Sequence, residues 1–227
     1  PFLDCVDMRL YRGPDSLVEF VRAVDVVLFC ETPLLPQVLP LCRRLGRRAV
    51  CVPMQEWLPL RHPWVRQVDL FICTTQHCYD ELQPMSLPCI CFPWPVDASR
   101  FAFRERATCQ RFLYLEGHGG TGGRKGAKVM RSALTRWPDM PLIVRTQRKS
   151  DWPAGLDVRS EVLSNELLYD EGDALILPHS VDGIALEPHE AMASGMPVIS
   201  TAGRPWDEYP ALARIEASTT VKTIGRR

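Results

Sequence analysis

The segment from Asp182 to Ile199 combines acids, glycines and apolar residues in an order suited to binding an anionic or hydroxyl-rich ligand. It opens with Asp182 and Gly183 after a strand-like run, continues into a short helical pattern that contains Glu190, and ends in another strand-like run. Backbone N–H groups at the start of a helix lack partners within the helix, and at the strand ends of an α/β sheet they attract anions. The sequence therefore predicts a ligand site here.

A glycine-rich segment at residues 117–126 supplies cations that such a ligand would need. It follows a strand-like run and opens a helical pattern, and its predicted ligand contacts are Gly117, His118, Gly119, Arg124 and Lys125. Because glycine lets the backbone approach a ligand closely, and because Arg and Lys bind phosphate, the segment predicts a phosphate site. A flexible surface turn with two solvated cations is the alternative.

Two common phosphate motifs do not fit this segment. Lys125 is followed by Gly126, so the Ser or Thr with which a P-loop holds Mg²⁺ is missing. The acid that a dinucleotide-binding fingerprint needs about twenty residues further on is not evident either. A plain NAD-binding protein is therefore disfavoured.

Short apolar runs alternate with helical patterns along the chain. The strand-like runs cover residues 24–30, 48–53, 68–73, 89–92, 111–116, 141–145, 173–178 and 197–201. The helical patterns cover residues 33–45, 75–83, 124–137, 164–170, 187–194 and, less regularly, 206–214. Continuous apolar strands with intervening helices predict parallel sheets covered on both faces. A proline-rich passage near residues 93–105 predicts a join between two α/β units.

Two motifs resemble those of family 4 retaining glycosyltransferases, the group 1 glycosyl transferases of GT-B fold. The donor signature of that family is an acid, Gly-Phe-Gly-Leu-Pro, a second acid eight positions after the first, and Ala-Met-Ala-x-Gly-x-Pro-Val. Asp182 and Glu190 have this spacing, and residues 190–198 match closely. Residues 93–101 have the outline of the family's linker, Pro-Asn-Gly-Val-Asp-x-x-x-Phe, with Trp-Pro in place of Asn-Gly.

The resemblance implies an α/β chain of GT-B architecture, with two Rossmann-like parallel-sheet domains facing a cleft. Residues 1–98 would be a partial acceptor-side domain, and residues 99–227 would be the domain that binds the nucleotide-sugar donor. The glycine-rich turn that opens the first domain of the family, and the final helix that crosses back to it, are not recognisable in the sequence. We therefore expect the first domain to be incomplete.

The resemblance also implies a role for each matching residue. Arg124 and Lys125 would neutralise the donor diphosphate, Glu190 would accept hydrogen bonds from the ribose hydroxyls, and Asp182 would face the donor sugar. Backbone N–H groups would come from four consecutive residues, Gly183, Ile184, Ala185 and Leu186. Leaving-group stabilisation would then need no tightly bound metal.

Two departures from the family pattern concern acids. Asp182 stands where the family usually has Glu, so its carboxylate reaches roughly 1.5 Å less far, about one C–C bond. Glu187 stands where the family has Pro and is a competing acid. The alternatives to ligand roles are ordinary ones: Asp182 as a turn residue before glycine, and Glu190 as an acid near a helix start.

In the first half, Glu56 follows the run at residues 48–53, and polar residues after strands face the cleft in such folds. Many relatives have a His at this place, whereas this chain has none. A carboxylate there could orient the acceptor or act as its base. An ordinary surface acid is the alternative.

The composition narrows the class of protein. The chain has 227 residues, of which 46% are hydrophobic and 24% charged, which predicts a packed core rather than disorder. The formal net charge is zero, so a broad basic field for a nucleic-acid polymer is absent and no such partner is expected. No run approaches the ~20 apolar residues needed to cross a bilayer.

Nine cysteines at irregular spacing predict reduced, buried thiols in a cytoplasmic protein. They lack the paired spacing of zinc sites, so we predict no metal and no tightly bound cofactor. The basic stretch at residues 43–48 leaves two interpretations open: peripheral contact with anionic lipid at the inner membrane face, or a solvated helix end.

The sequence thus predicts a metal-independent retaining glycosyltransferase that moves a sugar from a nucleotide-diphosphate sugar to an acceptor hydroxyl. The acceptor, whether glycan, lipid-linked or small molecule, and the donor base are not readable. A truncated or degenerate module that binds nucleotide sugar without transfer is the main alternative. A nucleotide-sugar epimerase is a second alternative.

Overall fold

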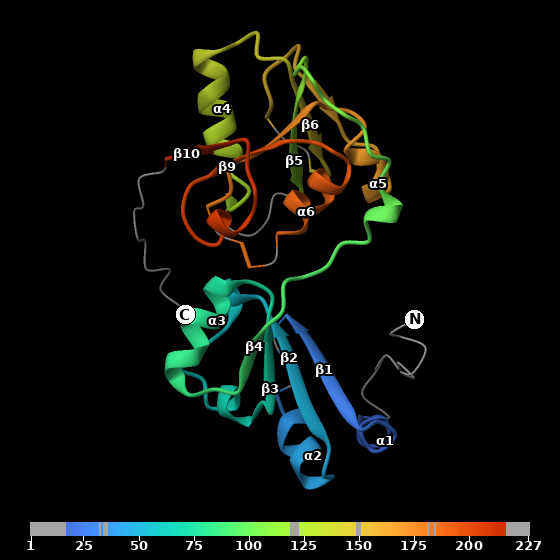
Figure 1. Cartoon of the computed structure of the whole chain (residues 1–227), viewed down its shortest axis with the longest axis vertical. Coiled ribbons are helices and arrows are strands. Elements are labelled where there is room, and N and C mark those ends of the chain that lie inside the picture. The colour runs from blue at the N-terminus through green and yellow to red at the C-terminus, as the bar shows by residue number, and fades with distance from the viewer. Residues whose placement is uncertain are drawn as a thin grey trace. The chain divides into compact units, whose positions relative to one another are not determined.

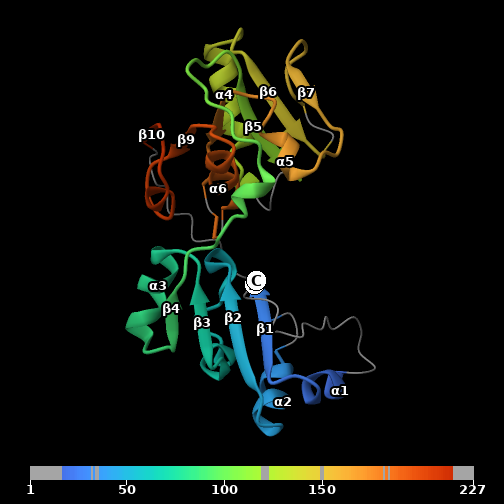
Figure 2. The same cartoon turned by 45° about the vertical axis from the view of Figure 1, so that its right-hand side comes forward.

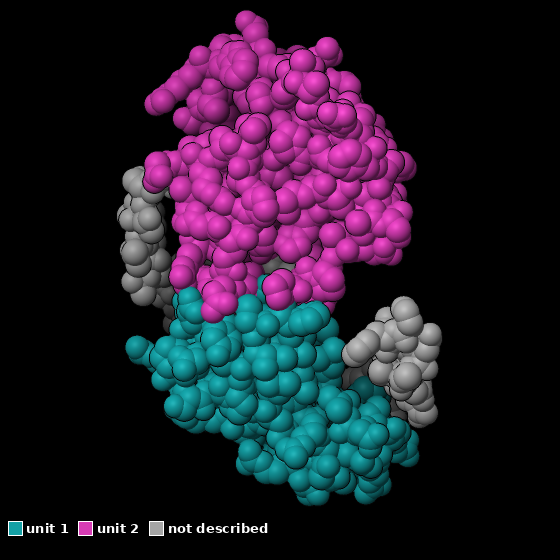
Figure 3. All heavy atoms as spheres, viewed as in Figure 1, with its two compact units in different colours: residues 1–74, 78–92 teal, residues 75–77, 93–227 magenta. Residues whose placement is uncertain are grey.

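The computed structural model describes residues 17–31, 33, 36–118, 123–148, 151–180, 182–183 and 185–216. They form two compact units (Figure 3). The first contains the described residues up to 74 together with 78–92, and the second contains 75–77 and those from 93 onward. The join expected at residues 98 and 99 stays a prediction.

The first unit is built on a four-stranded parallel sheet in the order β1-β2-β3-β4 (Figure 1). Its strands are β1 Val26–Glu31, β2 Arg48–Pro53, β3 Leu70–Cys73 and β4 Cys89–Cys91. The α-helices are α1 Leu17–Arg22, α2 Val38–Arg44 and α3 Gln76–Leu82. Short 3₁₀ turns lie at η3 Gln55–Trp57, η4 Pro63–Gln67 and η5 Gln83–Met85.

The two faces of this sheet differ sharply in burial. On one face Phe71 is fully buried and packs in a core with Leu39 of α2 and Leu82 of α3. On the other face Leu28 is 53% exposed and Ile90 is 47% exposed. Among the described residues, helices therefore cover only one face, so these residues do not provide the second covered face that the sequence predicts for this sheet.

The second unit is built on a six-stranded parallel sheet in the order β10-β9-β8-β5-β6-β7 (Figure 2). Its strands are β5 Phe112–Gly117, β6 Leu142–Thr146, β7 Asp157–Arg159, β8 Ala174–Leu177, β9 Val198–Thr201 and β10 Ala213–Ile215. The helices are η6 Ala98–Arg100, α4 Ala127–Arg136, α5 Asn165–Leu168, α6 Leu186–Ala193 and η8 Trp206–Glu208.

Both faces of this second sheet are covered, as the sequence predicts. One core joins Leu113 and Leu175 of the sheet to Ala191 of α6. The other joins Tyr114 and Val144 to helix α4. From β5 the chain builds outward to β6 and β7, then crosses back to β8 on the other side of β5. The strand order therefore reverses between β5 and β8, which is where open α/β sheets bind ligands.

Most observed strands and α-helices follow the predicted runs, but α1 and β7 lie outside them, and the end of the described chain also differs. The helix expected at residues 206–214 is wrong, because only Trp206–Glu208 is helical and Ala213–Ile215 is a strand. Pro210 has no N–H and pushes Tyr209 into extended backbone, at φ −103° and ψ 142°, so the helix stops there. No described helix has the length and apolar character required to cross a membrane.

Candidate functional site

The loops that follow β5 and β8 meet at the point where the strand order reverses. Gly126 lies at φ +79°, and a Cβ built on it would be 2.0 Å from the carbonyl oxygen of Pro178. The backbone N–H of Ser180 donates to the carbonyl of Arg124 at 2.9 Å. The hydroxyl of Tyr114 donates to the carbonyl of Lys125 at 3.0 Å. Glycine at position 126 therefore allows the two loops to join closely and places Arg124 and Lys125 beside the β8 loop.

Asp182 is the hub of a buried charge cluster. Its Oδ1 accepts from Nη1 of Arg124 at 3.1 Å and from the backbone N–H of Gly183 at 3.1 Å. Its Oδ2 lies 3.6 Å from Nζ of Lys125 and 3.2 Å from Nδ1 of His179. Asp182 is only 3% exposed and His179 only 1% exposed. Oδ1 is therefore held by two hydrogen bonds before any ligand binds, and Oδ2 faces Lys125 and His179 without a hydrogen bond to either.

The charge state of Asp182 follows from a balance of opposing effects. Burial raises the pKa of this carboxyl, but the polar contact with His179 and the nearby charges of Lys125 and Arg124 lower it. The net effect is a pKa below the usual value. Asp182 is therefore ionised at neutral pH and is a permanent negative charge in the cluster.

Lys125 contacts a second acid as well. Its ammonium pairs with the carboxylate of Glu187, in the first turn of α6. The two side chains are 14% and 20% exposed, respectively. Two cations and two acids are thus gathered at the joined loops, and they neutralise one another.

Glu190 is oriented from the side of α5. Its Oε2 accepts from the hydroxyl of Tyr169 at 2.6 Å, and its Oε1 accepts from the side-chain amide of Asn165 at 3.2 Å. Tyr169 is fully buried, and burial together with the Glu190 charge raises the pKa of its phenol well above the usual value. The phenol therefore stays protonated and remains a donor to Glu190.

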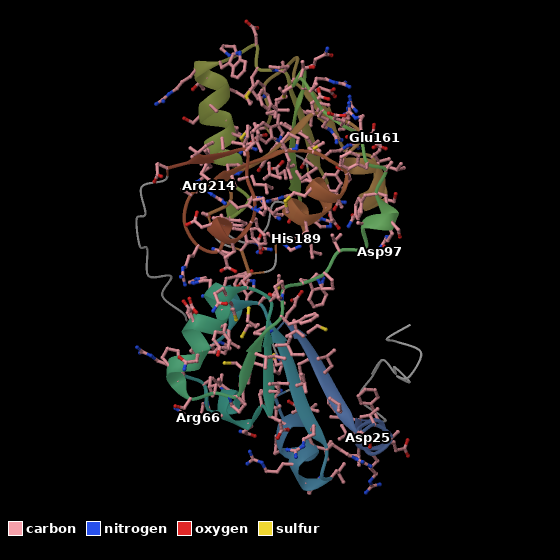
Figure 4. The ribbon with its side chains drawn as sticks, in the orientation of Figure 1. Asp25, Arg66, Asp97, Glu161, His189 and Arg214 are labelled. Carbon is pink, nitrogen blue, oxygen red and sulfur yellow. The ribbon has the colours of Figure 1, made fainter. Side chains whose placement is uncertain are left out.

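His189 precedes Glu190 on α6 and is labelled in Figure 4. Its ring packs edge-on against Tyr209 with centroids 4.9 Å apart. Burial lowers the pKa of His189, more than a hydrogen bond to the backbone of Trp94 and the charge of Glu190 raise it. His189 is thus a neutral packing residue at neutral pH.

The structure brings most of the predicted site residues together. Arg124, Lys125, Asp182 and Gly183 are in contact, and Ala185 and Leu186 lead from them into α6, which carries Glu190. Gly117 ends β5, and His118 directly follows it and is exposed. Ile184 and Gly119 lie outside the described residues. Glu56 belongs to η3 of the first unit, so its role stays a prediction.

Sequence reasoning missed three side chains that hold the site in place. They are Tyr114, Tyr169 and His179. His179 carried the clearest signal, because it stands three residues before Asp182 at the end of a buried strand. Among the described residues, no group of three or more His, Cys, Asp or Glu side chains is arranged to hold a metal ion.

No protein-family model and no curated protein sequence matches the chain. Solved structures do match. The pneumococcal O-GlcNAc transferase GtfA in complex with UDP and GlcNAc matches at a TM-score of 0.61 and 12% identity, over 85% of this chain and 46% of GtfA. Anabaena Alr3699/HepE in complex with UDP and glucose matches at a TM-score of 0.66 and 12% identity, over 85% of this chain and 63% of HepE. The lipopolysaccharide outer core galactosyltransferase WaaB matches at a TM-score of 0.60 and 15% identity, over 88% of this chain and 64% of WaaB.

At these identities the likeness concerns the fold. It confirms an α/β chain with two Rossmann-like parallel sheets of the GT-B type, as expected from the sequence. The chain spans about half to two thirds of the length of these three structures.

Proposed function

We propose that this chain binds a nucleotide-diphosphate sugar and supplies the donor site of a retaining glycosyltransferase of the family 4 type. The observation that carries the proposal is the contact of Arg124 and Lys125 with Asp182 where the strand order reverses between β5 and β8, followed in the chain by helix α6, which carries Glu190. The fold is also that of solved structures in complex with UDP and a sugar.

Glu190 is the residue that would bind the nucleoside. Each carboxylate oxygen has two lone-pair sites, and Tyr169 and Asn165 occupy one on each oxygen. The remaining sites can accept hydrogen bonds from the two hydroxyls of a ribose. Because Tyr169 is buried, the carboxylate is already oriented before the nucleotide arrives.

Arg124 and Lys125 would bind the diphosphate. In transfer, the acceptor oxygen attacks the anomeric carbon while the bond from that carbon to the diphosphate oxygen breaks, and the diphosphate takes the electron pair. Cations fixed beside the departing oxygen stabilise this growing charge without a metal ion. Backbone N–H groups of Ala185 and Leu186, at the start of α6, would add partial positive charge.

Asp182 and Glu56 would act on the transferred sugar and on the acceptor. Asp182 is already fixed by Arg124, His179 and Gly183, so it would accept from a sugar hydroxyl with its geometry set in advance. Glu56 follows β2 in the first unit and would orient the acceptor hydroxyl or take its proton. The acceptor would be a glycan, a lipid-linked sugar or a small molecule.

A second candidate function is nucleotide-sugar binding without transfer. It is favoured by the pairing of both cations with acids of the chain itself, and by Asp in place of the longer Glu at position 182. Such a module would bind the donor and release no free nucleotide.

Turnover distinguishes these functions. UDP-glucose, UDP-galactose and UDP-GlcNAc are incubated with the chain and a panel of sugar and lipid-linked acceptors, and UDP release and glycosylated product are measured. We expect acceptor-dependent UDP release that falls at least tenfold in Glu190→Ala and stays unchanged in Glu161→Gln, a remote acid of the same unit. Binding with no UDP release from any pair would favour the module. A changed sugar without acceptor would indicate an epimerase.

A further inference from the structure

Lys125 is held by two acids of different character. Asp182 is 3% exposed and is fixed by three partners besides Lys125. Glu187 sits in the first turn of α6 with its side chain 20% exposed, and within the described part of the chain Lys125 is its one polar partner. Asp182 is therefore a fixed anion, whereas Glu187 can leave Lys125 and turn toward solvent.

The charges in the cluster around Lys125 are balanced before any anion arrives. Arg124 and Lys125 together carry two positive charges, and Asp182 and Glu187 carry two negative ones. A nucleoside diphosphate would add two or more negative charges at the same place. Like charges close together in a partly buried site repel strongly, so a bound phosphate and Glu187 would compete for the Lys125 ammonium.

We propose that Glu187 is a built-in counter-anion that occupies Lys125 until a ligand phosphate replaces it, and that it thereby limits the affinity of the site for nucleoside diphosphates. The inference rests on the proposed function. It makes Glu187 a residue that sets affinity and charge selectivity, because exchange of one anion for another releases Glu187 to solvent without leaving Lys125 unpaired.

The variant Glu187→Gln removes the negative charge at position 187 but keeps nearly the same side-chain shape, so it isolates the effect of the charge on binding. We expect its Kd for UDP to fall about tenfold relative to the wild-type chain, a change of about 1.4 kcal/mol. The Kd for uridine, which has no phosphate, should not change. Glu161→Gln is the matched control, because it removes the same charge from a 72% exposed acid of the same unit. A merely structural role of Glu187 would weaken UDP and uridine together.

NMR of the lysine ammonium groups detects anion binding at Lys125 directly. The chain has four lysines, Lys125, Lys128, Lys149 and Lys222, so ¹⁵N-lysine labelling gives few ammonium signals, and Lys125→Arg assigns the relevant one. The Lys125 signal is followed while UDP, or inorganic pyrophosphate, is added to the wild-type chain and to Glu187→Gln. Circular dichroism confirms that each variant is folded.

The outcomes separate this inference from the proposed function. Tighter UDP binding by folded Glu187→Gln supports both. An unchanged or weaker Kd for UDP overturns the inference and leaves the proposed function standing. If neither the wild-type chain nor Glu187→Gln binds UDP, the proposed function fails. The pyrophosphate titration then tests the counter-anion role of Glu187 by itself. Saturation of the Lys125 signal at lower pyrophosphate concentration in the variant supports a counter-anion, and equal or absent saturation overturns it.

Discussion

Nδ1 of His179 lies 3.2 Å from Oδ2 of Asp182, and both side chains are almost completely buried. The ring of His179 also packs edge-on against Trp206, with centroids 5.4 Å apart. His179 contacts Oδ2 of Asp182, whereas Arg124 and Gly183 donate to Oδ1. The His179 contact links strand β8, which ends just before His179, to the charge cluster on which the proposed donor site depends.

Asp182 should contribute to stability in a pH-dependent way. Because its pKa is lowered in the folded chain, its contribution is fully present above the ordinary Asp pKa of about 3.9 and is lost as the pH falls through the lower folded-state value. Urea unfolding at pH 7, 5 and 3 should show that Asp182→Asn lowers the free energy of unfolding at pH 7 and 5. The difference from wild type should shrink at pH 3. A difference that is the same at all three values would contradict the assigned charge state.

Gly126 should tolerate no side chain. In Gly126→Ala the new methyl group would lie 2.0 Å from the carbonyl oxygen of Pro178, so the joined loops must separate. We expect a loss of more than about 4 kcal/mol in the free energy of unfolding, measured with urea. Gly155→Ala is the control, because Gly155 has φ +87° but open space around it, and it should lose only about 1–2 kcal/mol. Equal losses would mean that the close approach is not required.

Tyr169→Phe should loosen Glu190 without changing the shape of the core. The variant removes a 2.6 Å hydrogen bond to a carboxylate, so the free energy of unfolding should fall by about 1–2 kcal/mol. The Kd for UDP should rise several-fold because Glu190 is no longer oriented from α5. Tyr79→Phe, on α3 in the first unit, is the control for loss of a phenol. Unchanged UDP binding in Tyr169→Phe would argue against the ribose role of Glu190.

The elements that position the site could be predicted because their signals are local. Strand β2 coincides with the run expected at residues 48–53, because it is apolar and follows a turn at Gly46. Helix α6 ends as expected because Gly195 adopts φ +73°, the left-handed conformation that closes a helix. Strands β7 and β10 could not be predicted. Each is three residues long and contains at least one charged residue, so it gives no apolar run, and its pairing partner fixes it.

The contacts inside the site could not be predicted, because they join residues distant in the sequence. Lys125 and Glu187 are 62 positions apart, and Tyr169 and Glu190 are 21 apart. The motifs assign ligand roles to Lys125 and Glu190, which stay predictions, but they do not indicate that Lys125 already pairs with an acid of the chain itself. The exposure of one face of the first sheet, seen at Leu28 and Ile90, could not be predicted either. A short apolar run has the same sequence pattern whether one face of the strand is covered or both are.

Calorimetric titration of UDP, GDP and ADP into the folded chain is the most direct test of the proposed donor site. We expect saturable binding of one of these nucleotides, weakened at least tenfold by Glu190→Ala and by Arg124→Ala/Lys125→Ala. Glu161→Gln and Gly155→Ala should bind like the wild-type chain. Absence of binding by a chain shown to be folded, or binding that neither site variant weakens, would contradict a donor site at the joined loops after β5 and β8.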